Sequence, residues 1–343
     1  MNKTPFELNM DEQPDALRKV ASVGLPSEIT QVLRRKWDRI VFTGMGSSLF
    51  AAHPIWRYLS SKGIPAWNVD AGVLVDSPGL LNPETLVIAI SQSGGSGEIV
   101  ELLDRRSEKY VSCGYVLGIT SKAQSSLATR ADGYVDILSG DEATVSTKSY
   151  LNTLATLHKM RDLLLGGEVV SAEKETLQVA QTVEATLALN GAETVAVKSI
   201  ANAWYRLATV ARGADIATAT YAALITKEAA KVAIEGYAGG EFRHGPLELA
   251  GPGMTAFFYG VDSNHDGVLQ RLIRDTKATG ADVVTIGDQS IEGATNLHAE
   301  CSNELTRLAT GAVVSQQIAV ALARANSVEP GAFIYGRKVT ASF

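Results

Sequence analysis

The stretch Thr85–Ser96, TLVIAISQSGGS, joins six apolar or β-branched residues to a turn of serine, glutamine and glycine. A helical pattern follows from Gly97 to Tyr110. A strand without polar interruption is buried on both faces, as in a parallel sheet covered by helices on both sides. The stretch therefore predicts one strand–turn–helix unit of an α/β fold.

Similar short apolar runs lie on both sides of this stretch and alternate with helical segments. They are found at 39–43, 64–69, 115–120, 207–210, 255–260 and 282–286. The last three repeat runs of the first half at an offset of about 167 to 170 residues, which indicates a duplicated unit. We expect two tandem, doubly wound parallel-sheet domains with a helical N-terminal leader. The expected boundaries are 1–37 for the leader, 38–168 for the first domain, 169–190 for a linker helix, and 191–343 for the second domain with its C-terminal tail.

Length and composition exclude several classes of function. The 343 residues carry a net charge of -6 and no polybasic stripe, which argues against nucleic-acid binding. Cys113 and Cys301 lack metal-ligand spacing, so neither a zinc site nor a disulfide scaffold is expected. The first 20 residues lack the pattern of a signal peptide, and no apolar run reaches about 18 residues, so we expect a cytoplasmic protein without a membrane partner.

Two turns rich in serine and glycine follow neighbouring predicted strands. They are Thr43–Ser48, TGMGSS, and Ser91–Ser96, SQSGGS. In an open parallel sheet the ligand lies at this edge, where strands end and helices begin. Free amides and hydroxyl groups at a helix start, where the macrodipole amounts to about half a positive charge, form a site for an anion. We therefore expect an anion site without lysine, in a chain whose overall charge does not attract anions.

Other interpretations of these segments remain open. Gly44-Met45-Gly46 begins a dinucleotide-binding GxGxxG pattern and Asp70 is spaced as a ribose-binding acid, but Leu49 replaces the third glycine. The two turns are also compatible with simple connections. A third hydroxyl cluster, Thr144–Ser149, precedes a helical pattern and serves either as an N-cap or as another side of the anion site.

The second half contains candidates for acid–base chemistry. A predicted helix carries Glu228 and leads into a glycine-rich turn, Glu235–Leu247, that presents Glu241 and His244. A carboxylate and an imidazole can shuttle protons, and each such group contributes about 10²- to 10⁴-fold to a rate. Glu228 lies among lysines, as a solvated helical glutamate also does, whereas helix packing does not explain His244 next to Gly245-Pro246.

Taken together, these motifs resemble the double sugar isomerase (SIS) domain family. They are most similar to the isomerase domain of glucosamine-6-phosphate synthase and to stand-alone phosphosugar isomerases and deaminases. The similar region runs from about residue 38 to the end of the chain. The resemblance implies two flavodoxin-like SIS domains, a homodimer with shared active sites, and aldose–ketose interconversion through an enediol or enolamine without metal or redox cofactor.

The resemblance also implies roles for individual residues. The residues implied to hold the sugar and its 6-phosphate are Ser47, Ser48, Ser91, Gln92, Ser93, Ser96, Thr144 and Ser146. Glu228 matches the glutamate that moves a proton between C1 and C2 of the sugar. His244 matches the ring-opening histidine, which a neighbouring subunit supplies in the family. Lys338 matches the C-terminal lysine of the site, with Arg337 as the alternative by register.

Some positions depart from the synthase pattern. Ile225 stands where the synthase has a lysine, and Ser93-Gly94-Gly95-Ser96 replaces an acidic residue followed by threonine. No nucleophilic cysteine follows Met1, so ammonia transfer from glutamine is not expected.

These observations leave several functions open. They are isomerisation of a hexose carrying phosphate or another tetrahedral anion at carbon 6, isomerisation of an amino sugar with deamination, release of an amino acid from fructosamine 6-phosphate, and non-catalytic sensing of a sugar phosphate.

Overall fold

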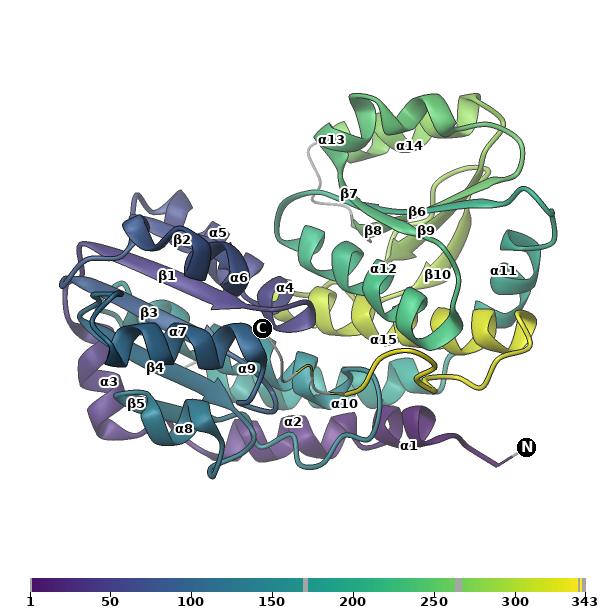
Figure 1. Ribbon diagram of the computed structural model, residues 1–343. Helices are drawn as coiled ribbons and strands as arrows, with labels where there is room; N and C mark the ends of the chain where they lie inside the picture. Colours follow the sequence, from purple (N-terminus) through teal and green to yellow (C-terminus); the bar gives the residue numbers. More distant parts are fainter. Residues whose placement is uncertain (1, 169–171, 263–266, 339, 341–343) are drawn as a thin grey trace. The chain divides into compact units, whose positions relative to one another are not determined.

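The computed structural model describes residues 2–168, 172–262, 267–338 and 340 (Figure 1). The chain forms two compact units, each built around a five-stranded parallel sheet. The first-sheet unit consists of Asp15–Glu142, Lys148–Leu177 and Tyr335–Phe343, and the second-sheet unit of Met1–Pro14, Ala143–Thr147 and Gln178–Ile334. The predicted duplicated α/β fold is confirmed. The predicted start of the linker, at residue 169, lies outside the described residues.

The first sheet has the strand order β2-β1-β3-β4-β5, with all neighbours parallel. Its strands are β1 (Arg39–Gly44), β2 (Ala66–Asp70), β3 (Thr85–Ile90), β4 (Tyr115–Thr120) and β5 (Gly133–Asp136). The order reverses between β1 and β3, which is where open α/β sheets bind their ligands.

Helices cover both faces of this sheet, as the apolar strands predicted. Along β3, Leu86, Ile88 and Ile90 pack into one core, and Val87 and Ala89 pack into the other. The helices of the unit are α3 (Ser27–Arg34), α4 (Ser47–Ala51), α5 (His53–Ser61), α6 (Ala71–Asp76), η1 (Pro78–Leu80), α7 (Gly97–Ser107), α8 (Ser126–Arg130) and α9 (Lys148–Leu163). Two more helices, α2 (Gln13–Ser22) and α10 (Ala172–Leu187), each contain one of the chain positions that divide the units.

The second sheet repeats this topology in the order β10-β9-β8-β6-β7. Its strands are β6 (Arg206–Ala211), β7 (Glu235–Ala238), β8 (Met254–Val261), β9 (Asp282–Gly287) and β10 (Thr295–His298). Strands β6 and β8 therefore correspond to β1 and β3 at the point where the order reverses. The helices of the unit are α1 (Pro5–Asp11), α11 (Ala192–Ser199), η2 (Gly213–Asp215), α12 (Ile216–Ala230), α13 (Gly239–Arg243), η3 (Pro246–Leu249), α14 (Val268–Ala278) and α15 (Glu304–Ala325).

Three strands were absent from the prediction: β5, β7 and β10. Each has four residues and lies at a sheet edge, so it pairs on one side only and lacks a long apolar run. In particular, the predicted turn at Glu235–Ala238 is wrong, because these residues form β7.

The longest helix, α15, is long and apolar enough to cross a membrane by length and composition alone. However, 83% of its apolar window is buried within the protein. It packs against α12 and α11 of the second-sheet unit, so its apolar composition is that of a core helix.

Candidate functional site

The first serine–glycine turn leads from β1 into α4. A Cβ on Gly44 would lie 2.7 Å from the carbonyl oxygen of Ile90, so this position requires glycine. Gly46, at φ 50°, is the N-cap of α4, and Ser47 and Ser48 begin the helix. Among the described residues, neither serine hydroxyl has a hydrogen-bond partner. Both hydroxyls can therefore bind a ligand without breaking an internal bond.

The second turn leads from β3 into α7 and depends on Gly94. This glycine has φ 62°, and a Cβ on it would lie 2.0 Å from Oγ of Ser125. Its amide donates to Oγ of the buried Ser91 at 3.1 Å, and its carbonyl accepts from the amide of Leu127 at 2.9 Å. The turn is thus held in one conformation by contacts with the start of α8.

Gln92 and Ser93 of this turn are held by local hydrogen bonds, whereas the Ser96 side chain leaves the helix uncapped. The backbone carbonyl of Gln92 accepts from the amide and the hydroxyl of Ser121 at 3.1 and 3.0 Å. Ser93 Oγ accepts from the amide of Gly95 at 3.3 Å. Ser96 is the N-cap residue of α7, but its side chain makes no capping hydrogen bond. The positive end of α7 is therefore not neutralised by its own N-cap side chain.

The two turns begin side by side, because Gly44 and Ile90 are paired in the sheet register. They lie at the point where the strand order reverses and contain neither lysine nor arginine. Hydroxyl groups and the N-terminus of the eleven-residue α7 form a neutral site with the polarity that an anion requires. Six of the eight predicted binding residues, those of the two serine–glycine turns, thus share one edge of one sheet.

Asp70 has a structural role that accounts for its spacing from the turn. Its Oδ1 accepts from the amides of Gly72 and Val73 at 2.9 and 3.3 Å and caps α6. The carboxylate is committed to the helix, which argues against the ribose-binding role of the dinucleotide interpretation.

Thr144 and Ser146 lie in the second-sheet unit. The carbonyl of Ser146 accepts from the hydroxyl of Tyr221, on α12, at 2.7 Å. Thr144 Oγ1 is buried and has no hydrogen-bond partner among the described residues. This segment is therefore attached to the helix that also carries Glu228.

Glu228 lies in the last turn of α12 and is half-buried. Ile225, one turn earlier, is fully buried, so the lysine of the synthase pattern is replaced here by a core side chain. Lys231 ends the helix in the left-handed conformation, at φ 56°. Its ammonium donates to the backbone carbonyls of Glu228 and Ala332. Burial lowers the pKa of Lys231, while the charge of Glu228 acts in the opposite direction.

Lys231 was not among the residues predicted for the site. The macrodipole of a helix stabilises a cation at its C-terminal end, so the position of Lys231 at the end of the predicted helix was the one indication of its role in the sequence. Its contact with a carbonyl about 100 residues away had no sequence signal.

His244 follows the short helix α13 and is exposed. Its amide donates to the carbonyl of Glu241 at 3.0 Å, and its imidazole makes no hydrogen bond within the described ranges. The structure therefore presents the ring of His244 at the surface of the second-sheet unit. It shows no hydrogen bond between His244 and Glu228.

The tail residue Lys338 belongs to the first-sheet unit. Its ammonium lies 2.7 Å from Oε2 of Glu142, whose side chain is 0% exposed. The preceding residue, Arg337, is exposed. Sequence reasoning did not identify Glu142, because its partner is 196 positions away.

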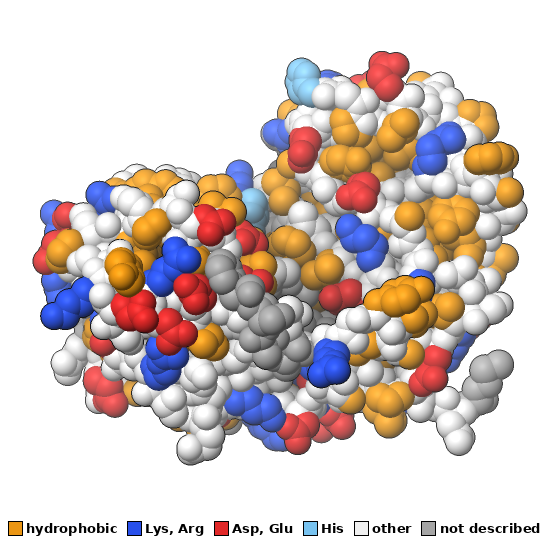
Figure 2. Space-filling view, in the orientation of Figure 1, with side chains coloured by type: hydrophobic (Ala, Val, Ile, Leu, Met, Phe, Trp, Pro, Cys, Tyr) orange, Lys and Arg blue, Asp and Glu red, His pale blue; other side chains and the backbone are white. Residues whose placement is uncertain are grey.

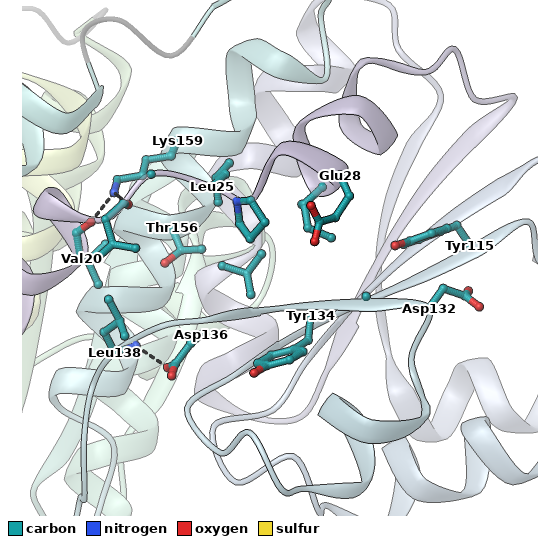
Figure 3. Close-up of a pocket in the computed structure, with 16 residues that line it drawn as sticks. Val20, Leu25, Glu28, Tyr115, Asp132, Tyr134, Asp136, Leu138, Thr156 and Lys159 are labelled. Carbon is teal, nitrogen blue, oxygen red and sulfur yellow. Dashed lines mark hydrogen bonds between the residues drawn. The ribbon is translucent and has the colours of Figure 1, made fainter.

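Two cavities in the described part of the chain contain none of the predicted site residues. One, of about 380 Å³, lies in the first-sheet unit between the α2–α3 turn, β5 and α9 (Figure 3). Lys159 lines it, but its ammonium is bound by the carbonyls of Val20 and Val23, and burial lowers its pKa. The other, of about 470 Å³, lies in the second-sheet unit beside Glu7 and Arg324. Neither cavity is lined by a residue of the two serine–glycine turns.

Acidic and basic side chains are interspersed on the face drawn in Figure 2. Within the described ranges, no group of three or more His, Cys, Asp or Glu side chains is arranged to hold a metal ion. The features that favour an anion are thus local ones, at the serine turns.

Comparisons with known proteins agree with this architecture. The glutamine–fructose-6-phosphate aminotransferase (isomerizing) of Pyrococcus horikoshii is 33% identical over 288 residues, which cover 81% of this chain and 47% of that protein. The chain thus spans about half the length of this relative. The C-terminal domain of glucosamine-fructose-6-phosphate aminotransferase from Francisella tularensis has a TM-score of 0.84 at 18% identity, with 96% of this chain and 99% of that chain covered. Tagatose-6-phosphate ketose/aldose isomerase from Escherichia coli has a TM-score of 0.80 at 20% identity, with 96% of both chains covered.

A family model described as the SIS domain matches residues 34–160 and 199–306. The two matched segments contain all five strands of each sheet. The chain belongs to the SIS domain family.

Proposed function

We propose that the protein is an aldose–ketose isomerase that acts on a hexose phosphorylated at carbon 6. The observation that carries the proposal is the neutral serine–glycine edge of the first sheet, in a chain of the SIS family. The similarity to a fructose-6-phosphate aminotransferase supports a 6-phosphorylated ketohexose as the substrate class. The phosphate would bind the hydroxyls of Ser47, Ser48 and Ser93 and the amides at the start of α7.

The chemistry needs one group that moves a proton between adjacent carbons. We assign this role to Glu228, whose carboxylate would remove a proton from C1 of the open-chain ketose. The carboxyl group then delivers a proton to C2 of the resulting enediol, after its proton has exchanged with solvent. O1 loses a proton and O2 gains one, so that the C2 ketone becomes a hydroxyl and the C1 hydroxyl becomes an aldehyde.

Ring opening and charge stabilisation require two further groups. We assign ring opening to His244, supplied by a second copy of the chain in a homodimer. Its exposed imidazole supports this assignment, because it is available to another molecule. Lys338 would supply positive charge to the developing enediolate.

Exchange with D₂O tests the proposal directly. The protein is incubated with fructose 6-phosphate, or with glucosamine 6-phosphate, and the aldose is examined for deuterium at C2. We expect incorporation with at least one substrate and a loss of about 10²-fold or more in Glu228→Gln. Glu248→Gln, an exposed glutamate on η3, is the matched control and should exchange as the wild type does.

Product analysis then distinguishes the related reactions. Release of ammonia identifies deamination, and release of an amino acid from a fructosamine 6-phosphate identifies deglycation. Absence of exchange with every substrate overturns the catalytic proposal. If sugar phosphates still bind in that case, and Ser93→Ala weakens the binding, the chain is a sugar-phosphate sensor.

A further inference from the structure

We propose that Glu142 is a positioning residue that anchors the C-terminal tail beside the serine turns and places Lys338 for the reaction. The role of Lys338 in catalysis rests on the proposed function, whereas the anchoring itself does not. All the residues of the argument belong to the first-sheet unit.

The tail is bound at two points. The Lys338 ammonium donates to Glu142 Oε2 at 2.7 Å, and the carbonyl of Thr340 accepts from the amide of Gly97 at 3.0 Å. Gly97 is the first residue of α7 and directly follows Ser96. The second contact therefore places the tail next to the turn that we expect to hold the phosphate.

Glu142 also binds the start of α9. Its Oε1 accepts from the amide of Ser149 at 3.2 Å, and its Oε2 accepts from the Ser149 hydroxyl at 2.7 Å. Ser149 is the second residue of α9, so the carboxylate lies at the positive end of a sixteen-residue helix. These bonds stabilise the charged carboxylate in a position from which water is excluded.

This dual contact makes the anchor reversible. When Lys338 withdraws, Glu142 keeps the amide and the hydroxyl of Ser149, so the buried carboxylate is not left without a partner. Lys338 is 22% exposed and can return its ammonium to water. The start of α9 therefore keeps its carboxylate partner whether or not Lys338 is bound.

The contact also separates two residues that the sequence could not distinguish. Arg337 is exposed and makes no side-chain hydrogen bond to a described residue. Lys338 is the tail cation held toward a buried carboxylate. Glu142 thus selects which of the two adjacent basic residues faces inward.

Limited proteolysis measures the anchoring without any assumption about substrate. Trypsin cleaves after Arg337 and Lys338, and intact-mass spectrometry follows loss of the last residues. We expect Glu142→Gln to release the tail about tenfold faster than the wild type, because the amide keeps the shape but not the charge. Ser149→Ala, which removes one uncharged donor from the same carboxylate and leaves the Lys338 ion pair, should change the rate less than threefold and is the matched control.

A second variant separates positioning from a general structural role. Lys338→Met should release the tail, by cleavage after Arg337, as fast as Glu142→Gln does. In the Lys338→Met background, Glu142→Gln should add less than twofold. An unchanged rate in Glu142→Gln, or an undiminished effect in the Lys338→Met background, contradicts the proposal. If Glu142→Gln does not fold, Lys338→Met alone still tests it, and a tail released no faster than in the wild type overturns it.

Kinetics test the catalytic consequence. With the substrate identified by D₂O exchange, we expect Glu142→Gln to lower kcat by about 10- to 100-fold with KM changed less than threefold, because the cation is displaced but the phosphate site is intact. An unchanged kcat overturns the positioning role even if the tail is released. If the wild type shows no activity, the proposed function fails, while the proteolysis still decides whether Glu142 anchors the tail.

Discussion

The carboxyl edges of the two sheets have the same topology and opposite chemistry. The first residue after β3 is Ser91, and the first after the corresponding strand β8 is Asp262. The first residue after β4 is Ser121, and the first after β9 is Asp288. One duplicated edge thus carries hydroxyl groups where the other carries carboxylates.

The second edge contains an internal cation. The Nε of Arg307, on α15, donates to both carboxylate oxygens of Asp215 at 2.9 and 3.0 Å, and its Nη1 donates to Asp262 at 3.2 Å. Asp215 and Asp262 are 2% and 3% exposed. Burial alone would lower the pKa of Arg307, but the charge and hydrogen bonds of Asp215, with the charge of Asp262, raise it above its ordinary value.

This comparison shows how a duplicated scaffold can acquire two different roles. In the first sheet, the N-terminus of α7 faces neutral groups and is suited to a ligand with negative charge. In the second, Asp215 is the N-cap residue of α12, but its side chain makes no capping hydrogen bond, and its carboxylate accepts from Arg307 instead. The candidate chemistry of α12 lies at its other end, where Glu228 and Lys231 are found.

The largest effect is expected from the internal cation of the second edge. Arg307→Met removes the cation that two buried carboxylates share and should destabilise the protein by about 3–5 kcal/mol. Urea unfolding followed by circular dichroism measures this loss. Arg307→Lys keeps the charge and should lose clearly less. A Met variant within about 1 kcal/mol of the wild type would show that the ion pairs do not hold this edge together.

A carboxylate placed at the edge of the first sheet should abolish the chemical difference between the two sheet edges. Ser93→Asp puts a negative charge beside the proposed phosphate and should weaken sugar-phosphate binding by about 100-fold or more, since like charges in a site cost several kcal/mol. Ser93→Ala, which removes one hydrogen bond to a charged group, should weaken it only about tenfold. Isothermal titration calorimetry gives both values. Equal affinities for Ser93→Asp and the wild type would place the anion elsewhere.

The backbone of the first edge can be tested with two adjacent glycines. Gly94→Ala introduces a Cβ 2.0 Å from Ser125 Oγ at a positive φ and should cost about 2 kcal/mol of unfolding free energy. Gly95→Ala, whose Cβ would find its nearest neighbour at 4.0 Å, is the matched control and should stay within about 0.5 kcal/mol. Thermal unfolding distinguishes them, and equal losses would contradict the close approach at Gly94.

Local patterns predicted the central strands and the serine turns. The predicted runs 85–90 and 115–120 coincide with β3 and β4, because a strand buried on both faces is apolar throughout. The turns were predicted because glycine permits the tight backbone turn that is needed where a strand ends and a helix begins, with serine beside it.

Contacts between distant residues had no such signal. Glu142 meets Lys338 across 196 positions, and Asp215 meets Arg307 across 92. These pairs form because the fold brings different elements to one place, whereas a lone glutamate or arginine in the sequence resembles any solvated charge. Whether a sheet edge is suited to a ligand or is occupied by the protein's own ion pairs can therefore be seen only in the structure.

The smallest expected effect concerns Asp288, the counterpart of Ser121. Partial desolvation of the largely exposed carboxylate, followed by the charges of Asp262 and Glu300, raises the pKa of Asp288 above its ordinary value of 3.8. The folded protein therefore binds more protons than the unfolded chain in the window just above pH 3.8, and its stability falls as pH rises through that window. Because the side chain is exposed, the penalty at neutral pH should be no more than about 0.5 kcal/mol.

Asp288→Asn cannot lose a proton and should remove this part of the pH dependence. We expect the variant to exceed the wild type in stability at pH 7 by that small amount, and the difference to vanish as pH falls toward 3.8. Ser121→Ala, at the first edge, should change stability by the same amount at every pH, because serine does not titrate there. Urea unfolding at a series of pH values measures both. A wild type more stable than Asp288→Asn at pH 7 would mean that the carboxylate at the second edge is stabilised by its surroundings, as an anion at the first edge would be.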